Sequence, residues 1–556
     1  MLSRRKRVFM AAEKKSTDFL KQGGILAIAS LFVRLIGLIY RIPMSNILGE
    51  EGNGIYAVAF EIYDLILIIS SYSLPLAMSK IISAQSAQKQ YKNTSKTLQV
   101  GMIFALISGG VFGCVLLFGA GAIERYIYPE YAGVQIPLRI LAPTILIVAF
   151  LGVFRGFFQG KRTMMPTAIS QVIEQVVNAV VSVVASYLFM KWTFGDLHNA
   201  AWGAAGGTLG TCLGAASALL LLVFLISIYR PVLRKQERRD RTGHVDSTGY
   251  LFRVLLMTIL PVILSQTVYN ISGLIDYKIF GYFSAQSGVG PVEIKSLVGV
   301  YSSKYRVMCS VPIALSTALA SSMIPSAVAA FTEKDYKQLR YNIASVMKFN
   351  MIIAFPCFIG YTVLGMPIIK MLFSSNYILG GKMLVTGSLA LVFYALSNVT
   401  GGALQSINRM SLPVIHSAIS LAVHVGIVIV CVRYTDFGIY SLLVGNITFP
   451  MVVWLLNLWA LKRYIPGGYQ QEIVKTFIAP LAAALWMGVV TVGVYELAGI
   501  VTDSNIIRTL VSIMVAMPVY FVVLLMLHTV TRDELVEFPF GYRLYALAKK
   551  LRLMPS

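Results

Sequence analysis

Charged side chains lie inside several long apolar runs of the sequence, where they could bind an anion within a membrane. Arg34 and Arg41 are seven residues apart, so an α-helix places them on one face. Lys304 and Arg306 lie about eight to ten residues from the end of a later run, which is about 12–15 Å deep. A charge at that depth is tolerated beside water, an acid or a bound anion. These four cations are therefore predicted to line a wet cavity that binds an anionic substrate.

Four acids lie in the same kind of run. Glu61 and Asp64 are three residues apart and share a helix face, and Glu174 and Asp276 lie in later runs. One interpretation makes them internal ion-pair partners, for example of Arg34, that fix helix contacts. The other makes them groups that position the cavity cations or couple protons or ions. Cations nearer the ends of runs are expected to extend toward the interface: Lys80, Arg139, Arg155, Lys348 and Lys370.

No pattern of catalytic, metal-binding or nucleotide-binding residues accompanies these charges. The five cysteines are scattered through apolar runs without metal-ligand spacing. His416 and His424 could share a helix face, but two histidines are a weak metal signal. GxxxxGK[ST] is absent, so no built-in ATPase is indicated. The sequence predicts no catalytic residue, no metal and no cofactor, and leaves open coupling to an ion gradient or to the membrane potential.

The composition indicates a membrane protein rather than a soluble one. Hydrophobic residues make up 57% of the 556 and charged residues only 13%, whereas soluble domains have about 25% charged residues. The net charge of +23 could suggest nucleic acid. However, Lys and Arg fall mainly in short segments between apolar runs, as in membrane proteins. Nucleic-acid binding is therefore not expected.

The apolar runs predict an all-α polytopic membrane protein with about fourteen transmembrane helices. The expected spans are 24–44, 54–82, 98–120, 136–158, 166–190, 201–229, 251–280, 297–325, 343–372, 383–405, 412–432, 438–461, 474–498 and 507–530. Glycines of the sixth span, Gly203, Gly206, Gly207, Gly210 and Gly214, are expected to let helices pack closely. The outer loops are short, so no soluble domain is expected between spans.

The distribution of Lys and Arg predicts the orientation. With the N-terminus in the cytoplasm, 30 of these residues fall on the cytoplasmic side and six outside. Both termini are then cytoplasmic, in a multi-pass protein of the plasma membrane. The basic start followed by a long apolar run is interpreted as a retained first span rather than a signal peptide.

A weak internal repeat suggests two lobes of six helices. Short basic turns lie between Gln159 and Pro166 and again between Gln405 and Pro413. An even number of spans per repeat gives two pseudo-symmetric lobes in the same orientation. The predicted parts are an N-terminal lobe (1–229), a basic cytoplasmic linker (230–250), a C-terminal lobe (251–461), two further helices (462–530) and an amphipathic cytoplasmic tail (531–556).

The sequence resembles the polysaccharide-transport and lipid II flippase family, the SpoVB/YtgP/MurJ-like branch of the MATE-related superfamily. The resemblance lies in the run from Arg34 to Tyr56 with its glycines, in Ser73–Lys80, in Arg306 followed by Pro325, and in the two Gln–Pro turns. It covers nearly the whole chain, including the number of spans.

The resemblance implies a two-lobed bundle that opens alternately to each side. It also implies a cationic central cavity for a polyprenyl-diphosphate-linked saccharide and a groove beside the last two spans for the lipid tail. Arg34 and Arg306 fall where lipid II flippases carry cavity arginines. One departure is Tyr40-Arg41, which stands where the Gram-negative flippases have an Arg-Asp pair; the spacing favours the Gram-positive branch.

Three functions remain in competition. The leading one is a flippase for a lipid-linked cell-wall precursor, lipid II first among them, which binds its substrate and makes no bond. A MATE-type drug or cation exporter would favour an acidic cavity, and a membrane glycosyltransferase or polymerase would need larger outer loops. The expected partners are the lipid-linked anionic glycan and membrane lipid, and contact with the cell-wall synthesis machinery is left open.

Overall fold

The chain is helical throughout the part that the structure describes. The computed structural model describes residues 2–192, 199–242, 245–530 and 550, with side chains from Ala29 onward except Leu31, Ser265 and Tyr269. These residues form seventeen α-helices with short π and 3₁₀ turns, and no strand occurs among them. The prediction of an all-α polytopic membrane protein is confirmed.

Twelve of the described helices or helix combinations are long and apolar enough to cross a membrane, or thirteen if the bent pair Tyr377–Gly387 and Ala390–Ser406 forms one span. The sequence predicts about fourteen. The difference lies in Phe32–Ala87, which counts once although it has 56 residues. At 1.5 Å per residue this stretch is about 84 Å long, enough for two crossings of a core about 30 Å thick.

Gly49 breaks that long stretch. Its φ of 65° is a left-handed conformation inside α1 (Leu2–Ser70) that glycine adopts without a steric cost. The Asn53 side-chain amide donates to the carbonyls of Gly49 at 2.5 Å and Ser45 at 2.8 Å. The break therefore has its own cap, which satisfies carbonyls that the interrupted helix leaves open.

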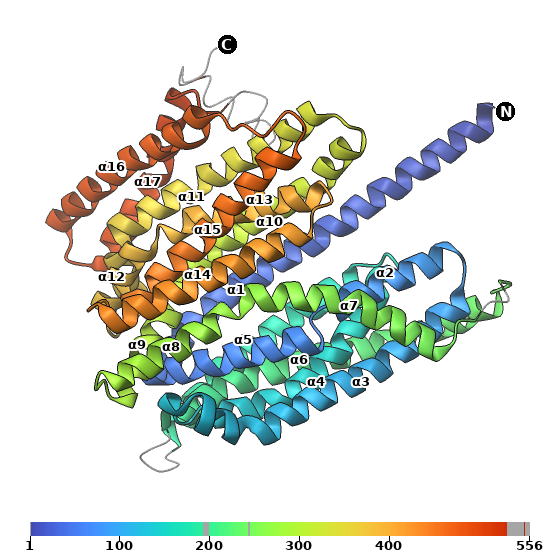
Figure 1. Cartoon of the computed structure of the whole chain (residues 1–556), viewed down its shortest axis with the longest axis horizontal. Coiled ribbons are helices and arrows are strands. Elements are labelled where there is room, and N and C mark those ends of the chain that lie inside the picture. The colour runs from blue at the N-terminus through green and yellow to red at the C-terminus, as the bar shows by residue number, and fades with distance from the viewer. Residues whose placement is uncertain (1, 193–198, 243–244, 531–549, 551–556) are drawn as a thin grey trace. The chain divides into compact units, whose positions relative to one another are not determined.

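Close contacts divide the chain into two compact units, Met1–Gly299 and Val300–Ser556. Figure 1 labels the principal helices of both. The first unit holds α1, α2 (Leu74–Ala87), α3 (Tyr91–Ala122), η1 (Ile123–Ile127), η2 (Pro129–Tyr131), α4 (Gln135–Gly160), α5 (Met165–Lys191), α6 (Asn199–Arg238), α7 (Thr248–Asn270), α8 (Ser272–Gln286) and most of α9 (Pro291–Val300). The second holds η3 (Tyr301–Arg306), α10 (Val307–Thr332), α11 (Tyr336–Leu372), α12 (Tyr377–Gly387), α13 (Ala390–Ser406), α14 (Ser411–Tyr434), α15 (Tyr440–Tyr464), η4 (Val474–Ile478), α16 (Ala479–Val501) and α17 (Asn505–Met526).

The predicted lobes at 1–229 and 251–461, and the separate pair at 462–530, stay a prediction. The tail at 531–556 lies outside the described residues apart from Lys550. The predicted linker is docked at one end of the first unit, where Asp240 accepts hydrogen bonds from the Lys92 amide (2.8 Å) and from Thr242. Hydrogen bonds from Thr242 and Lys92 lower the pKa of this carboxyl to about 2.

Small residues bring the helices of the first unit into close contact, as the sequence predicts for the sixth span. A Cβ added at Gly206 or Gly210 of α6 would lie within 2.7 Å of backbone atoms of α5. Gly156 of α4 likewise has no room for a Cβ beside Pro75 and Met78. The expected packing role of the α6 glycines is confirmed at these positions.

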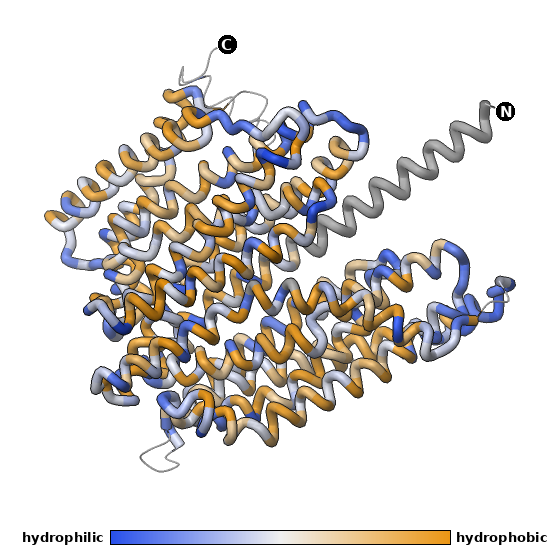
Figure 2. Tube along the Cα trace, in the orientation of Figure 1, coloured by the Kyte–Doolittle hydropathy of each residue, from blue (hydrophilic) through white to orange (hydrophobic). Residues whose placement is uncertain are grey.

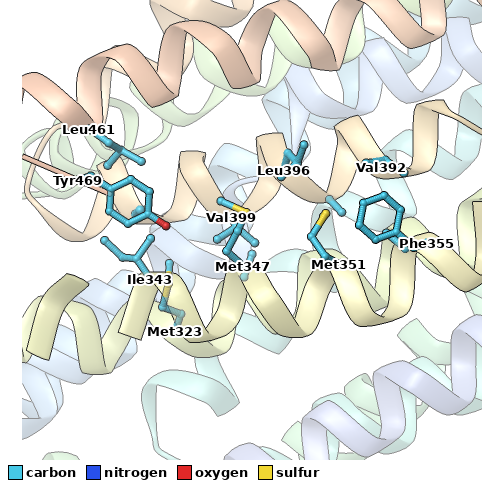
Figure 3. Packing of buried hydrophobic residues seen from close by; sticks show 14 of the residues in the cluster. Met323, Ile343, Met347, Met351, Phe355, Val392, Leu396, Val399, Leu461 and Tyr469 are labelled. Carbon is cyan, nitrogen blue, oxygen red and sulfur yellow. The ribbon is translucent and has the colours of Figure 1, made fainter. Parts of the chain in front are cut away.

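The second unit has a large apolar core. Ile343, Met347, Met351 and Phe355 of α11 recur every four residues, so one helix face carries them all. Figure 3 shows this row facing Val392, Leu396 and Val399 of α13. Along the helices of each unit, hydrophobic segments end in hydrophilic turns (Figure 2), as expected for spans that end at a membrane surface.

Candidate functional site

Arg41, Asp64 and Glu174 gather around tyrosines of the first unit. The Arg41 guanidinium lies among the side chains of Tyr40, Tyr56 and Asp64. Tyr63 lies near both Asp64 and Glu174, which links the second half of α1 to α5. Arg41 is half-buried and Asp64 is exposed, so this group combines a partly desolvated cation with an accessible carboxylate.

Arg34 lies two turns before Arg41 on α1, and its side chain is exposed. The spacing of seven residues gives both arginines similar directions around the helix. A guanidinium can hold a diphosphate through two parallel hydrogen bonds. The role predicted for this pair in binding an anion stays a prediction.

Glu174 forms its ion pair with a residue that the sequence interpretation assigned to the membrane interface. Arg155 Nη2 of α4 lies 2.5 Å from Glu174 Oε2, and its Nε donates to Ser170 Oγ at 3.0 Å. These side chains are only 14% and 28% exposed. Neither their separation of 19 residues nor the local pattern reveals this pairing, because it depends on how α4 and α5 are rotated against each other.

Glu61 and Asp276 form a second group, at α8. A Cβ added at Gly273 would lie 2.8 Å from Glu61 Oε2, so this glycine makes room for the carboxylate. Asp276 follows one turn later on α8 and is 5% exposed. The structure therefore brings Glu61 to the helix that carries Asp276, while Asp64 lies near Arg41 and Glu174 pairs with Arg155.

The contact of α8 and α9 with the rest of the first unit, here called the α8–α9 junction, is built from polar groups. Lys278 pairs with Glu130 at 3.1 Å and Lys295 pairs with Glu51 at 2.5 Å. Tyr131 donates to the Tyr277 carbonyl at 2.8 Å. Burial raises the pKa of the Tyr131 hydroxyl well above its ordinary value of 10, so it remains a donor at neutral pH.

Two glycines allow the backbones at this junction to touch. A Cβ at Gly54 would lie 1.9 Å from the Lys295 carbonyl oxygen, and one at Gly299 would lie 1.9 Å from that of Glu50. No side chain fits in either place. Gly54 belongs to the run that carries the family resemblance, and here its physical role is close helix approach.

Lys304 and Arg306 lie in the π turn η3 at the start of the second unit. Lys304 is 2% exposed; its Nζ donates to the Ser375 carbonyl and lies 6.0 Å from the centre of the Phe373 ring. Arg306 is half-buried. The structure thus places the Lys304 ammonium against the connection between α11 and α12, and the substrate role predicted for both residues stays a prediction.

A metal site finds no support in the described ranges, where no three His, Cys, Asp or Glu side chains are grouped suitably. The two histidines are committed to helix packing: His416 Nδ1 lies 2.7 Å from Asn457 Oδ1, and His424 Nδ1 lies 2.8 Å from the Gly445 carbonyl. These contacts join α14 to α15 inside the second unit.

Known proteins match most of the length of this chain. Residues 19–331 match the family profile described as polysaccharide biosynthesis protein, and residues 287–379 match a second profile of that description. Stage V sporulation protein B of Bacillus subtilis (strain 168) is 22% identical over 95% of this chain and 98% of its own length. Lipid II flippase MurJ of the same organism is 24% identical over 85% of this chain and 88% of its own length.

A solved structure of lipid II flippase MurJ in an inward closed conformation shares the fold. It matches with a TM-score of 0.65 and 17% identity over 90% of this chain and 97% of that one. The matches confirm the family resemblance inferred from the sequence. Where their names state an activity, these proteins are flippases, which agrees with a transporter and not an enzyme.

Proposed function

This chain belongs to the family of polysaccharide biosynthesis proteins, and from that premise we propose that it is a flippase for a polyprenyl-diphosphate-linked cell-wall saccharide precursor. Lipid II is the proposed cargo, moved from the cytoplasmic to the outer leaflet. Two observations support this proposal. Lipid II flippase MurJ aligns over 85% of the chain, and the first unit has a half-buried arginine, Arg41, within a span together with the exposed Arg34. The second observation carries the proposal, because cations inside a membrane suit a diphosphate.

In the proposed mechanism, two lobes open alternately to each side of the membrane. Arg34, Arg41 and Arg306 hold the diphosphate, whose oxygens match a guanidinium in plane and spacing. Asp64 positions Arg41 or, with the other acids within the spans, carries the coupling ion. The driving force is an ion gradient or the membrane potential, and an ionophore that collapses the driving gradient should stop transport in vesicles.

The proposed orientation places both termini and the linker in the cytoplasm. It is tested with single cysteines in a background from which the five native cysteines have been removed. Arg239→Cys lies in the linker and Ser287→Cys in an outer loop, and both positions are exposed. A membrane-impermeant maleimide added to intact cells should label Ser287→Cys only, and labelling of Arg239→Cys alone would reverse the topology.

Depletion of the protein tests the cargo. If it flips lipid II, depletion should make lipid II accumulate on the cytoplasmic leaflet, and purified protein in vesicles should move lipid II without altering it. A drug exporter would instead leave the lipid unmoved and expel cationic dyes. Accumulation of a different polyprenyl-linked glycan would keep the flippase and replace the cargo.

A further inference from the structure

A cavity of about 550 Å³ lies inside the second unit, between α11, α15 and η4. This size is within the range of small-molecule sites. Its walls include Met347, Trp454, Leu458 and Phe477, and Tyr469 is 1% exposed. Met347 and Tyr469 also belong to the hydrophobic cluster in Figure 3, so the cavity extends from the core of this unit.

The polar groups within the cavity are already paired. The Gln471 side-chain amide donates to the Ala344 carbonyl at 3.3 Å and to Thr476 Oγ1 at 2.5 Å, and its oxygen accepts from the Tyr469 hydroxyl. Because these groups are satisfied by the protein, the interior offers a ligand mainly apolar and aromatic surface. Such a surface suits a hydrocarbon chain rather than a polar molecule.

The mouth has the opposite character. Lys462 and Gln470 line it and are exposed, and among the described residues the Lys462 ammonium has no hydrogen-bond or ion-pair partner. Other cations nearby are held on neighbouring groups: Arg463 lies over Trp459 (5.5 Å), Arg409 over Tyr464 (4.5 Å), Arg340 donates to the Pro466 carbonyl (2.8 Å) and Lys475 pairs with Glu472 (3.4 Å). These cations lie on or against the end of α15 and the turn that follows it, at the end that the charge distribution predicts to be cytoplasmic.

We propose that this cavity binds an anionic membrane phospholipid. One acyl chain enters the aromatic pocket, and the phosphate lies against the Lys462 ammonium and the Gln470 amide. Basic pockets between helices on the cytoplasmic side suit the headgroups of that leaflet, which is rich in anionic lipid. All the lining residues belong to the second unit.

Trp454 provides a direct probe of occupancy. The other four tryptophans, Trp192, Trp202, Trp459 and Trp486, are replaced by phenylalanine, and the protein is titrated in detergent with phospholipids whose acyl chains carry bromine, a contact quencher. Brominated phosphatidylglycerol should quench Trp454 saturably and at least fivefold more tightly than brominated phosphatidylcholine. Lys462→Gln should weaken the phosphatidylglycerol titration about fivefold, the loss expected for one cation near a headgroup.

Two further variants test whether the effect is specific to this cavity. The melting temperature and the size-exclusion elution volume of each variant check that it folds. Lys337→Gln removes an exposed cation of α11 that does not line the cavity and should leave the titration unchanged. Met347→Phe narrows the cavity and should abolish saturable quenching. Equal quenching by both lipids, or equal weakening by Lys462→Gln and Lys337→Gln, would overturn the site. Displacement of the brominated lipid by a polyprenyl phosphate more readily than by phosphatidylglycerol would overturn its assignment to phospholipid.

Discussion

The two units differ in where their acids lie. The first unit carries Glu61, Asp64, Glu174 and Asp276 within its predicted spans, and Arg155 finds its counter-charge there. Between residues 300 and 530, the second unit has six acids, all at or near helix ends or in connections: Glu333, Asp335, Asp436, Glu472, Glu496 and Asp503. The first unit therefore carries acids within its predicted spans, whereas the acids of the second unit lie toward helix ends and connections.

Substitution of Arg306 should have the largest effect of the changes that test this difference between the two units. Arg306 is half-buried in η3, at the start of the second unit, and in the proposed mechanism its guanidinium holds the substrate diphosphate. Arg306→Ala should abolish transport, and Arg306→Lys should lower it at least tenfold because an ammonium lacks the bidentate fit. Complementation of depleted cells and protein abundance, measured together, check this expectation.

The competing account makes Arg306 a structural partner of Asp276 or Glu61. Arg306→Ala should then lower abundance, and removing the acid as well should restore it, because an uncompensated buried charge destabilises the fold. Normal abundance without transport supports the substrate role. Normal transport by Arg306→Ala at normal abundance would contradict both accounts.

The Arg155–Glu174 pair gives the largest expected stability effect within the first unit. Glu174→Gln leaves the guanidinium partly buried without its carboxylate and should lower the free energy of unfolding by about 2–3 kcal/mol. The double variant Arg155→Met with Glu174→Leu should lie within about 1 kcal/mol of the parent. Thermal denaturation in detergent measures both, with Arg139→Met, an exposed arginine on the same helix, as the control. Equal losses in the single and double variants would exclude the charge explanation.

Removing a carboxylate at the α8–α9 junction should lower the free energy of unfolding less, because the remaining partner of the Glu130–Lys278 pair can be hydrated. Glu130 is 7% exposed but the Lys278 side chain is 33% exposed, so an abandoned ammonium still reaches water. Glu130→Gln is expected to cost about 1 kcal/mol. A double-mutant cycle with Lys278→Met measures the coupling between them; a coupling as large as that of Arg155 with Glu174 would remove the distinction between buried and rehydrating pairs.

Local patterns in the sequence predicted the helices well. Apolar runs define spans because backbone groups in a membrane must be paired within a helix, and the α6 glycines indicated close packing. Gly49 was less evident: its positive φ interrupts the helix, yet glycine also occurs inside uninterrupted helices such as α6. Whether a glycine packs or breaks a helix is decided by contacts such as those of Asn53.

The partners of charged residues could not be predicted in the same way. Lys304 meets the Ser375 carbonyl, which is 71 residues away, and Arg155 meets Glu174 across a helix pair. Sequence spacing gives the face of each helix, but the rotation of one helix against another selects the partner. The sequence therefore located charges inside spans and assigned Arg155 to the interface, although it forms a partly buried ion pair.

Lys161 should give the smallest effect, and it extends the comparison to a first-unit cation without an acid. It lies in the turn after α4, where burial lowers the pKa of its ammonium from 10.5 to about 8. Its Nζ lies 3.4 Å from Gln236 Oε1 and 5.3 Å from the centre of the Tyr91 ring, contacts that only partly replace lost hydration. Because the folded-state pKa is depressed, the stability linked to this group is present above pH 10.5 and is lost as pH falls through 8.

Lys161→Met should therefore raise the free energy of unfolding at pH 7 by on the order of 1 kcal/mol. It should also reduce the increase in the free energy of unfolding that the parent shows between pH 8 and 10. Melting temperatures of the parent and the variant across that range measure the difference; a Lys161→Met variant less stable at pH 7, with the rise unchanged, would show that the ring and amide contacts outweigh the desolvation of the ammonium.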